Sequence, residues 1–227
     1  MAAPRPAPCA CCGESWAPAS RPGGLTMRGV ARQLGVTPMT LYTYVPGKAE
    51  LLDLMLDAAY LRMPRTAHAG APWRARLETV ARENRELYRR HPWVAARPVT
   101  HPPPGPGVMA KYEHELAAFD GLGLDDVTTD AALAFLLGFV ESVARAELQA
   151  RAAERDGAPT GEQWWAAHAP VLATVFAPGR YPRAARIGGS AAADRRSAHD
   201  TERAFTFGLG RALDGLAVLV ERARSAP

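Results

Sequence analysis

Apolar residues first recur with a helical period just after position 24. Between Met27 and Leu34 they stand at positions i, i+3, i+4 and i+7, which predicts a short helix with one buried side. Thr26 precedes this run as an N-cap, and Gly35 follows it as a stop. The chain therefore enters its ordered part through a helix of about two turns.

Two further helices follow at once. Thr37 is a second N-cap, with Pro38 at the first helical position, and this helix ends near Tyr44. After the turn Pro46-Gly47, a third helix is predicted over residues 48–63 and ends before a proline. Its buried side consists of Leu51, Leu52, Met55, Ala58 and Ala59.

The remainder of the chain repeats the helical period over longer stretches and shows no alternating strand pattern. We therefore predict an all-α fold, with a helix-turn-helix unit followed by a larger helical domain. The sequence Gly188-Gly189-Ser190 predicts a mobile segment over 181–196. Helices are predicted over residues 73–90, 92–96, 107–119, 125–155, 160–176 and 200–224.

Length and composition agree with two folded units. The chain has 227 residues, of which 48% are hydrophobic and 22% charged, which is typical of globular proteins. Residues 1–24 are rich in Pro, Ala and Gly and are predicted to be a disordered leader. We expect a helix-turn-helix unit over 25–63 and a larger helical domain over 72–227.

No secretory or membrane segment is predicted. The start of the chain has no apolar core of a signal peptide, and no run approaches 18 uninterrupted apolar residues. We therefore expect a cytoplasmic protein with no membrane partner. Cys9, Cys11 and Cys12 all fall in the leader without a second ligand cluster, so no metal and no cofactor is predicted.

Charge is distributed unevenly around the first helices. No Asp or Glu occurs between Ser15 and Ala49, whereas this stretch contains three arginines and Lys48. Such a local cationic face is typical of a phosphate-binding module. A solvated basic face without a partner is the alternative.

Short polar residues and tyrosines crowd the second helix, which has few bulky apolar residues to bury. Two short helices joined by a glycine-containing turn form a helix-turn-helix, whose second helix enters the DNA major groove. The alternative is a surface helix with capping threonines and packed tyrosine rings. On the first interpretation, Thr37 and Thr40 bond bases or phosphates, Pro38 and Met39 touch thymine methyl groups, and Tyr42, Tyr44 and Lys48 reach phosphates.

The run LTMRGVARQLGVTPMTLYTYVPGKAELLDLML resembles the TetR family of transcriptional repressors from residue 25 to about residue 60. The segment FTFGLGRALDGLAVLVE, Phe205–Glu221, resembles the last helix of the ligand-binding domain in tetracycline-repressor-type members. Transferred by position, the DNA contacts of the family fall on Thr26, Arg28, Thr37, Pro38, Met39, Thr40, Tyr42, Tyr44 and Lys48.

The resemblance also implies partners. Family members are homodimers in which two long helices of each subunit form a four-helix bundle, here residues 125–155 and 200–224. A dimer sets two recognition helices at a fixed separation, which a palindromic double-stranded operator must match. The larger domain of the family encloses a small-molecule effector, whose binding releases the recognition helices.

Candidate effector contacts can be chosen only by type and spacing. Asn84 stands at helical spacing with Leu77, Val80 and Leu87, so its amide is predicted to point inward, where it could contact an effector. The alternative partner of this amide is a backbone carbonyl or a water molecule. The magnesium–tetracycline site of the family is not assumed, because its histidine and glutamate positions are not evident. The further candidates are His91, Trp93, Phe135, Phe139, Trp164 and His168.

One departure from the family concerns its first helix. Members carry an amphipathic helix of a dozen or more residues just before position 25, whereas Pro18 and Pro22 here forbid a continuous one. Either the DNA-binding unit is incomplete or residues 1–24 are not the natural start. A ligand- or protein-binding helical dimer without specific DNA binding therefore stays open, whereas an enzyme is disfavoured by the lack of catalytic motifs.

Overall fold

The computed structural model describes residues 25–96, 103–159, 161–175, 180–194 and 201–225. All regular structure in these ranges is helical, so the predicted all-α class is confirmed. The predicted leader, residues 1–24, lies outside the described residues.

Three short helices form the N-terminal unit: α1 (Met27–Gln33), α2 (Pro38–Tyr44) and α3 (Lys48–Leu61). The hydroxyl of Thr26 accepts a hydrogen bond from the Gly29 N–H at 3.0 Å and caps α1, as predicted. Gly35 follows with φ of +69°, a conformation that residues with a Cβ rarely adopt. Glycine at this turn lets α2 fold back against α1.

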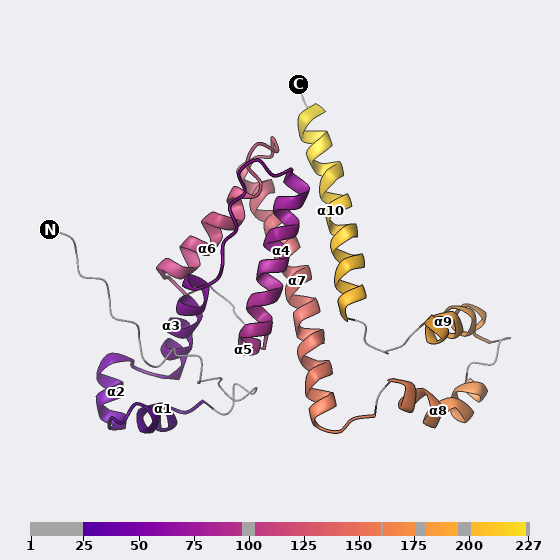
Figure 1. The fold of residues 1–227 in the computed structure, drawn as a ribbon, viewed down its shortest axis with the longest axis horizontal. Coiled ribbons are helices and arrows are strands. Elements are labelled where there is room, and N and C mark those ends of the chain that lie inside the picture. Colours follow the sequence, from indigo (N-terminus) through magenta and orange to yellow (C-terminus); the bar gives the residue numbers. More distant parts are fainter. Residues whose placement is uncertain (1–24, 97–102, 160, 176–179, 195–200, 226–227) are drawn as a thin grey trace.

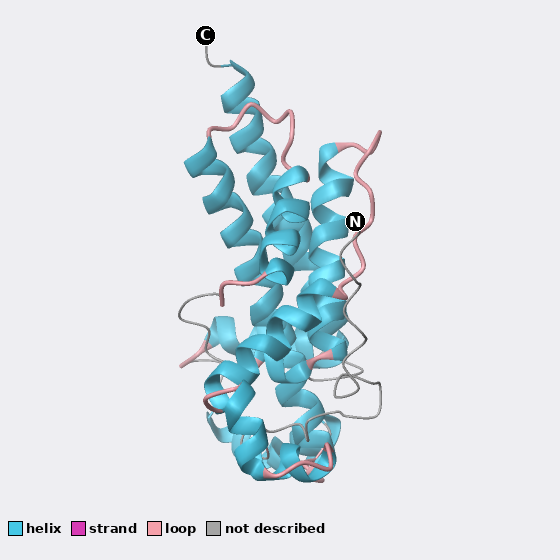
Figure 2. Ribbon diagram, turned by 90° about the vertical axis from the view of Figure 1, so that its left-hand side faces the viewer, coloured by secondary structure: helices cyan, strands magenta, loops and turns pink. Residues whose placement is uncertain are grey.

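The larger unit is arranged around α7 (Asp126–Arg155), which packs against α4 (Trp73–Arg90) and α10 (Thr201–Ser225) (Figure 1). The short α5 (Pro92–Ala95) and α6 (Pro106–Ala117) complete it on the side of the N-terminal unit (Figure 1). Figure 2 shows the same elements from the side, as helices joined by loops. The buried centre includes Leu77, Val80, Leu133, Leu136, Val140, Phe205, Leu209 and Leu213.

The helices α4 and α10 run antiparallel and are joined by charged side chains at two levels. The guanidinium of Arg74 donates to Asp214 at 2.5 Å near the start of α4. Near its end, Arg85 and Arg89 reach Glu202, in the first turn of α10. The direction of α10 is therefore fixed by ion pairs as well as by its apolar side.

A close backbone contact joins the two units. The N–H of Val108 donates to Oδ1 of Asp57 at 2.9 Å, linking α6 to α3. At Gly107 an added Cβ would overlap the carbonyl oxygen of Asp57. Only a residue without a side chain allows α6 to lie this close to α3 of the N-terminal unit.

Two helices stand to one side of this assembly. Figure 1 shows α8 (Gly161–Val175) and α9 (Pro182–Asp194) beside the ends of α7 and α10, and most of their described side chains are exposed. The prediction of a mobile segment over 181–196 was wrong where α9 forms a helix. Its alanines favour a helix strongly enough to outweigh the paired glycines.

The length and apolar composition of α7 would suffice to cross a membrane. In the structure this helix lies between α4 and α10 and buries Leu133, Leu136 and Val140 against them. A central helix of a folded domain has the same composition, so the absence of a membrane partner stays a prediction.

We expect Gly107→Ala to lower the free energy of unfolding by about 2 kcal/mol, because the new methyl group must push α6 away from the Asp57 carbonyl. Urea denaturation followed by circular dichroism measures this. Gly210→Ala is the matched control, since a Cβ at Gly210 meets no atom within 4 Å. Equal stability of the two variants would contradict the close α3–α6 contact.

Candidate DNA-binding surface and effector domain

The short helix α2 is divided between a buried and an exposed side. Leu41 and Val45 are buried and pack with Met27 and Ala31 of α1, as expected for residues that hold α2 in place. The opposite edge is open, with 75% of Met39 and 79% of Tyr44 exposed. Thr37, Thr40 and Tyr42 are also exposed on this helix.

The threonines of α2 already make local hydrogen bonds. Oγ1 of Thr37 accepts from the Thr40 N–H at 3.2 Å, which caps the helix, and it lies 2.9 Å from Oγ1 of Thr40. One of these two hydroxyls donates to the other, so the second can donate outward. Thr43 instead donates to the carbonyl oxygen of Met39 at 3.1 Å, which is a local role.

The remaining predicted contacts frame α2. Thr26 and Arg28 are exposed at the start of α1, Pro38 is half-buried at the start of α2, and Lys48 is half-buried at the start of α3. The structure therefore brings the nine predicted residues onto the three helix starts and the outer edge of α2. Whether they touch DNA stays a prediction.

The predicted inward direction of Asn84 is confirmed. Its side chain is fully buried in α4, and Nδ2 donates to the Val80 carbonyl oxygen at 3.0 Å and to Oε1 of Glu115 at 2.5 Å. Lys111 also donates to this carboxylate, at 2.7 Å. Oδ1 of Asn84 has no hydrogen-bond partner among the described residues. A polar cluster thus lies between α4 and α6 inside an apolar domain.

The other predicted effector contacts are spread over the domain. Trp93 is buried beside Leu56 of α3, and His91, whose pKa is lowered by burial and by neighbouring arginines, lies 6.4 Å from it between ring centroids. Phe139 stacks on Phe205 with centroids 6.1 Å apart. The structure does not bring the remaining three to this region: Phe135, which is 56% exposed on α7, and Trp164 and His168, which stack on each other on α8.

A buried ion network links α4, α7 and α10. Glu147 of α7 is 5% exposed and accepts from Nε of Arg85 at 2.8 Å and from Nε of Arg89 at 3.1 Å. Burial raises the pKa of Glu147, but the hydrogen bonds from Arg89 and Arg85 outweigh it and bring the pKa below its usual value. Nη1 of Arg85 also lies 2.8 Å from Glu202 of α10.

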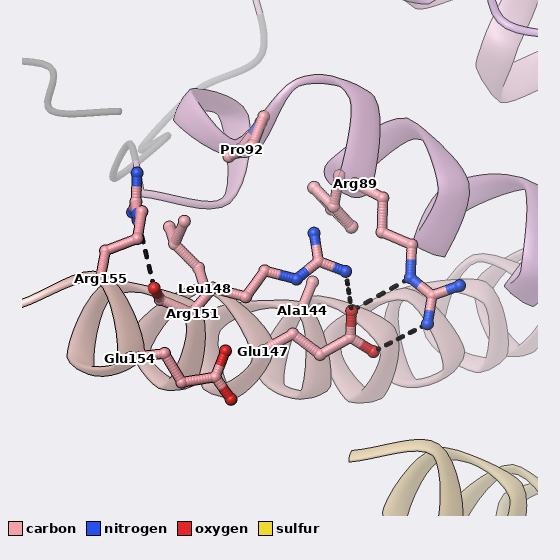
Figure 3. Close-up of a pocket in the computed structure, with 9 residues that line it drawn as sticks. Arg89, Pro92, Ala144, Glu147, Leu148, Arg151, Glu154 and Arg155 are labelled. Atoms are coloured by element: carbon pink, nitrogen blue, oxygen red, sulfur yellow. Dashed lines mark hydrogen bonds and ion pairs between the residues drawn. The ribbon is translucent and has the colours of Figure 1, made fainter. Parts of the chain in front are cut away.

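A cavity of about 370 Å³ opens beside this network (Figure 3). Tyr88 and Arg89 of α4, Pro92 of α5, and Glu147 and Arg151 of α7 are among the side chains that line it. Burial raises the pKa of Tyr88 well above its usual value, so the ring keeps its hydroxyl proton. None of the seven predicted effector contacts is among the residues that line this cavity.

A comparison with known protein families identifies the family to which this architecture belongs. The sequence profile described as tetracyclin repressor-like, C-terminal domain, matches residues 66–220, which is more than half of the chain. The chain belongs to the TetR family of transcriptional regulators. The predicted resemblance is thereby confirmed.

Two relatives support membership of the TetR family. The HTH-type transcriptional repressor DrrR1 of Streptomyces coeruleorubidus is 42% identical over 207 residues, covering 90% of this chain and 74% of that protein. An HTH-type transcriptional regulator of Saccharopolyspora erythraea is 32% identical over 123 residues, which are 54% of this chain and 52% of that protein. The chain thus spans about half the length of the second relative.

Solved structures share the fold. The Streptomyces coelicolor TetR family protein ActR in complex with actinorhodin superposes with a TM-score of 0.71 over 86% of each chain, at 22% identity. BioQ of Mycobacterium smegmatis gives a TM-score of 0.57 at 26% identity, covering 86% of this chain and 87% of that one.

Within the TetR-type domain, sequence reasoning missed the charged network and the cavity beside it. One signal was present, because Glu147 occupies the same helix face as the buried Val140 and Ala144. A carboxylate on the buried side of a helix requires a cationic partner. The spacing of Arg85 and Arg89, one turn apart on the preceding long helix, could have supplied it.

Replacing Glu147 by Gln leaves Arg85 and Arg89 without their shared carboxylate. We expect the free energy of unfolding near neutral pH to fall by about 3 kcal/mol in urea denaturation. The folded pKa of Glu147 lies below the ordinary value of 4.5, so its charge stabilises fully above that value and less as pH falls through the folded pKa. The difference from the unaltered protein should therefore shrink in acid.

Glu141→Gln is the control for the Glu147 variant. Its carboxylate pairs with Arg145 on the exposed side of α7 at 2.5 Å, so its loss should change stability by less than about 1 kcal/mol. A Glu147→Gln effect that stays constant between neutral and acidic pH would show that the carboxylate charge is not what stabilises this site.

Proposed function

We propose that this protein is a TetR-type transcriptional repressor that binds a palindromic DNA operator as a homodimer and responds to a small-molecule effector. The main support for this proposal is the outer edge of α2. Met39, Thr40 and Tyr44 are exposed there, while Leu41 and Val45 are buried on the opposite side. The name of the relative DrrR1, a repressor at 42% identity, favours the same direction of regulation. We place the protein in the cytoplasm, where its operator would be, and propose no enzymatic activity.

Each exposed side chain has a role that its chemistry suggests. Thr40 and Met39 lie on the open edge of α2, where a hydroxyl can bond a base edge and a thioether can touch a thymine methyl group. Tyr42, Tyr44 and Lys48 are longer and suit phosphates on either side. The stretch from Ser15 to Ala49 lacks carboxylates, so no negative side chain within it would repel the DNA backbone.

The homodimer is supported by exposed apolar side chains on the two longest helices. On α10, Phe207 is 68% exposed and Val218 follows it on the outer side, while α7 exposes Val127 and Phe135. Gly138 of α7 and Gly215 of α10 leave open space on their helices, which permits close helix crossing. A second copy covering these residues would complete a four-helix bundle.

An effector would act through the contact between the two units. The helix α3 belongs to the DNA-binding unit and packs against α5 and α6 of the larger one. A ligand that binds one arrangement of these helices more tightly than another changes the population able to bind DNA. Asn84 lies near this contact, and its Oδ1 is buried without a hydrogen-bond partner among the described residues. A small structural change could give this oxygen a hydrogen bond.

DNA binding can be tested with duplexes from the intergenic region beside the gene, by mobility shift at several salt concentrations. Tyr42→Phe and Lys48→Gln should weaken binding to all sequences alike, and Lys48→Gln should lower the salt dependence by about one counterion. Thr40→Val and Met39→Ala should instead change preference among operator bases, by about 1–3 kcal/mol at the affected position.

The matched control for Met39→Ala is Met109→Ala, an exposed methionine on α6 that should leave DNA binding unchanged. If all four α2 and α3 variants behaved alike, the division into base and phosphate contacts would be wrong. Weak, sequence-independent binding by the unaltered protein would favour the other candidate, a helical dimer that has lost specific DNA binding.

We expect Phe207→Glu to convert the dimer to a monomer at micromolar concentration, because it buries charge in the proposed apolar bundle. Size-exclusion chromatography with light scattering gives the mass directly. Met109→Glu places the same charge on another exposed apolar site and should leave the mass unchanged. A Phe207→Glu protein that still has the dimer mass would refute this interface.

A further inference from the structure

We propose that the cavity between α4, α5 and α7 binds the effector, and that it selects an apolar molecule of aromatic size that carries one acidic group. This inference rests on the proposed effector response of the regulator and names the site and the class of ligand. A volume of about 370 Å³ is at the lower end of the range for small-molecule sites.

The polar side of the cavity is cationic. Three arginines line it, Arg89, Arg151 and Arg155, against two glutamates, Glu147 and Glu154. Figure 3 shows the guanidinium groups of Arg89 and Arg151 on either side of the Glu147 carboxylate. That carboxylate also accepts from Arg85, so Arg151, whose pair with Glu147 is long, retains capacity for a second anion.

Arg151 is the arginine best placed for such an anion. Its ion pair with Glu147 is long, at 3.9 Å, and its side chain is 54% exposed. By contrast, Arg89 approaches Glu147 at 3.1 Å and also reaches Glu202 at 3.4 Å. A carboxylate or sulfonate on the cavity side of Arg151 would gain charge-assisted hydrogen bonds from its guanidinium, and only the long pair with Glu147 would be weakened.

The other walls are apolar. Tyr88 of α4, Pro92 of α5, and Ala144 and Leu148 of α7 contribute a ring, a proline face and two aliphatic groups. Contacts of this kind favour an aromatic or alicyclic body and give little to a small hydrophilic anion. The ligand therefore needs both an apolar body and an acidic group.

The cavity is also connected to the DNA-binding unit through packed residues. Pro92 lines the cavity, and the next two residues, Trp93 and Val94, are buried against Leu56 of α3. On the far side, Arg89 connects the cavity to Glu202 at the start of α10. A ligand that moved α5 relative to α7 would therefore change the support of α3.

The class of ligand can be tested with two fluorescent probes that share an aromatic body. These are 8-anilino-1-naphthalenesulfonate, which is anionic, and N-phenyl-1-naphthylamine, which is neutral. We expect the anionic probe to bind the full-length protein more tightly than the neutral one. Arg151→Gln should weaken the anionic probe by about fivefold and leave the neutral probe nearly unchanged.

Two more variants complete the design. Leu148→Trp fills the apolar side and should weaken both probes, whereas Arg90→Gln removes an exposed arginine that pairs with Glu86 outside the cavity and should weaken neither. Circular dichroism confirms that each variant is folded. Unchanged binding of both probes to Leu148→Trp would overturn the site, and equal effects of Arg151→Gln on both probes, or no binding of the anionic probe, would overturn the ligand class.

A DNA measurement separates this inference from the proposed function. The anionic probe should weaken operator binding by the unaltered protein and have less effect on Arg151→Gln. Specific operator binding by a protein that takes up neither probe would overturn the effector site and leave the repressor intact. Probe binding as expected, but no specific DNA binding, would overturn the proposed repressor and leave the anion-selective cavity.

Discussion

The contact between α3 and α6 is the constraint on which the relation between the two units depends. Gly107 lies so close to the Asp57 carbonyl that no side chain fits, and Val108 donates to the Asp57 carboxylate. Packed helices with such short backbone separations slide or rotate in discrete steps and do not deform smoothly. Any change in the larger domain that shifts α6 must therefore be accompanied by a change in α3, which carries the DNA-binding unit.

Ion pairs in the larger domain determine how its helices are oriented relative to one another. Leucine and valine packing around α7 would tolerate several rotations of α4 and α10. The buried pair Arg85–Glu147 fixes one rotation, because a displaced helix would leave a buried guanidinium or carboxylate without its partner, and the partly exposed pair Arg74–Asp214 favours the same rotation. The cost of separating such a pair makes the bundle specific as well as stable.

Much of the helical layout follows from the sequence, because helices depend on local period and on caps. The N-caps Thr26 and Thr37 accept the bonds expected of them, and α7 and α10 begin and end within a residue of their predicted bounds. The charged network did not follow, since Arg85 and Glu147 are 62 positions apart and no periodicity reports a pairing across helices. The helix α9 was missed because two glycines were given more weight than the alanines around them. Asn84 was predicted to point inward from its spacing alone, yet its bond to Glu115 required the fold of α6 to be known.

The separation of buried and exposed positions within α2 has a consequence for how such a regulator can diversify. Leu41 and Val45 hold the helix to its unit, while Met39, Thr40 and Tyr44 make no contribution to that small core. New combinations at the outward positions can therefore arise without a folding penalty, provided that Thr37 keeps its cap. A lineage of such proteins, or an engineer, can exchange one set of target genes for another while the chemical signal that the larger domain senses stays the same.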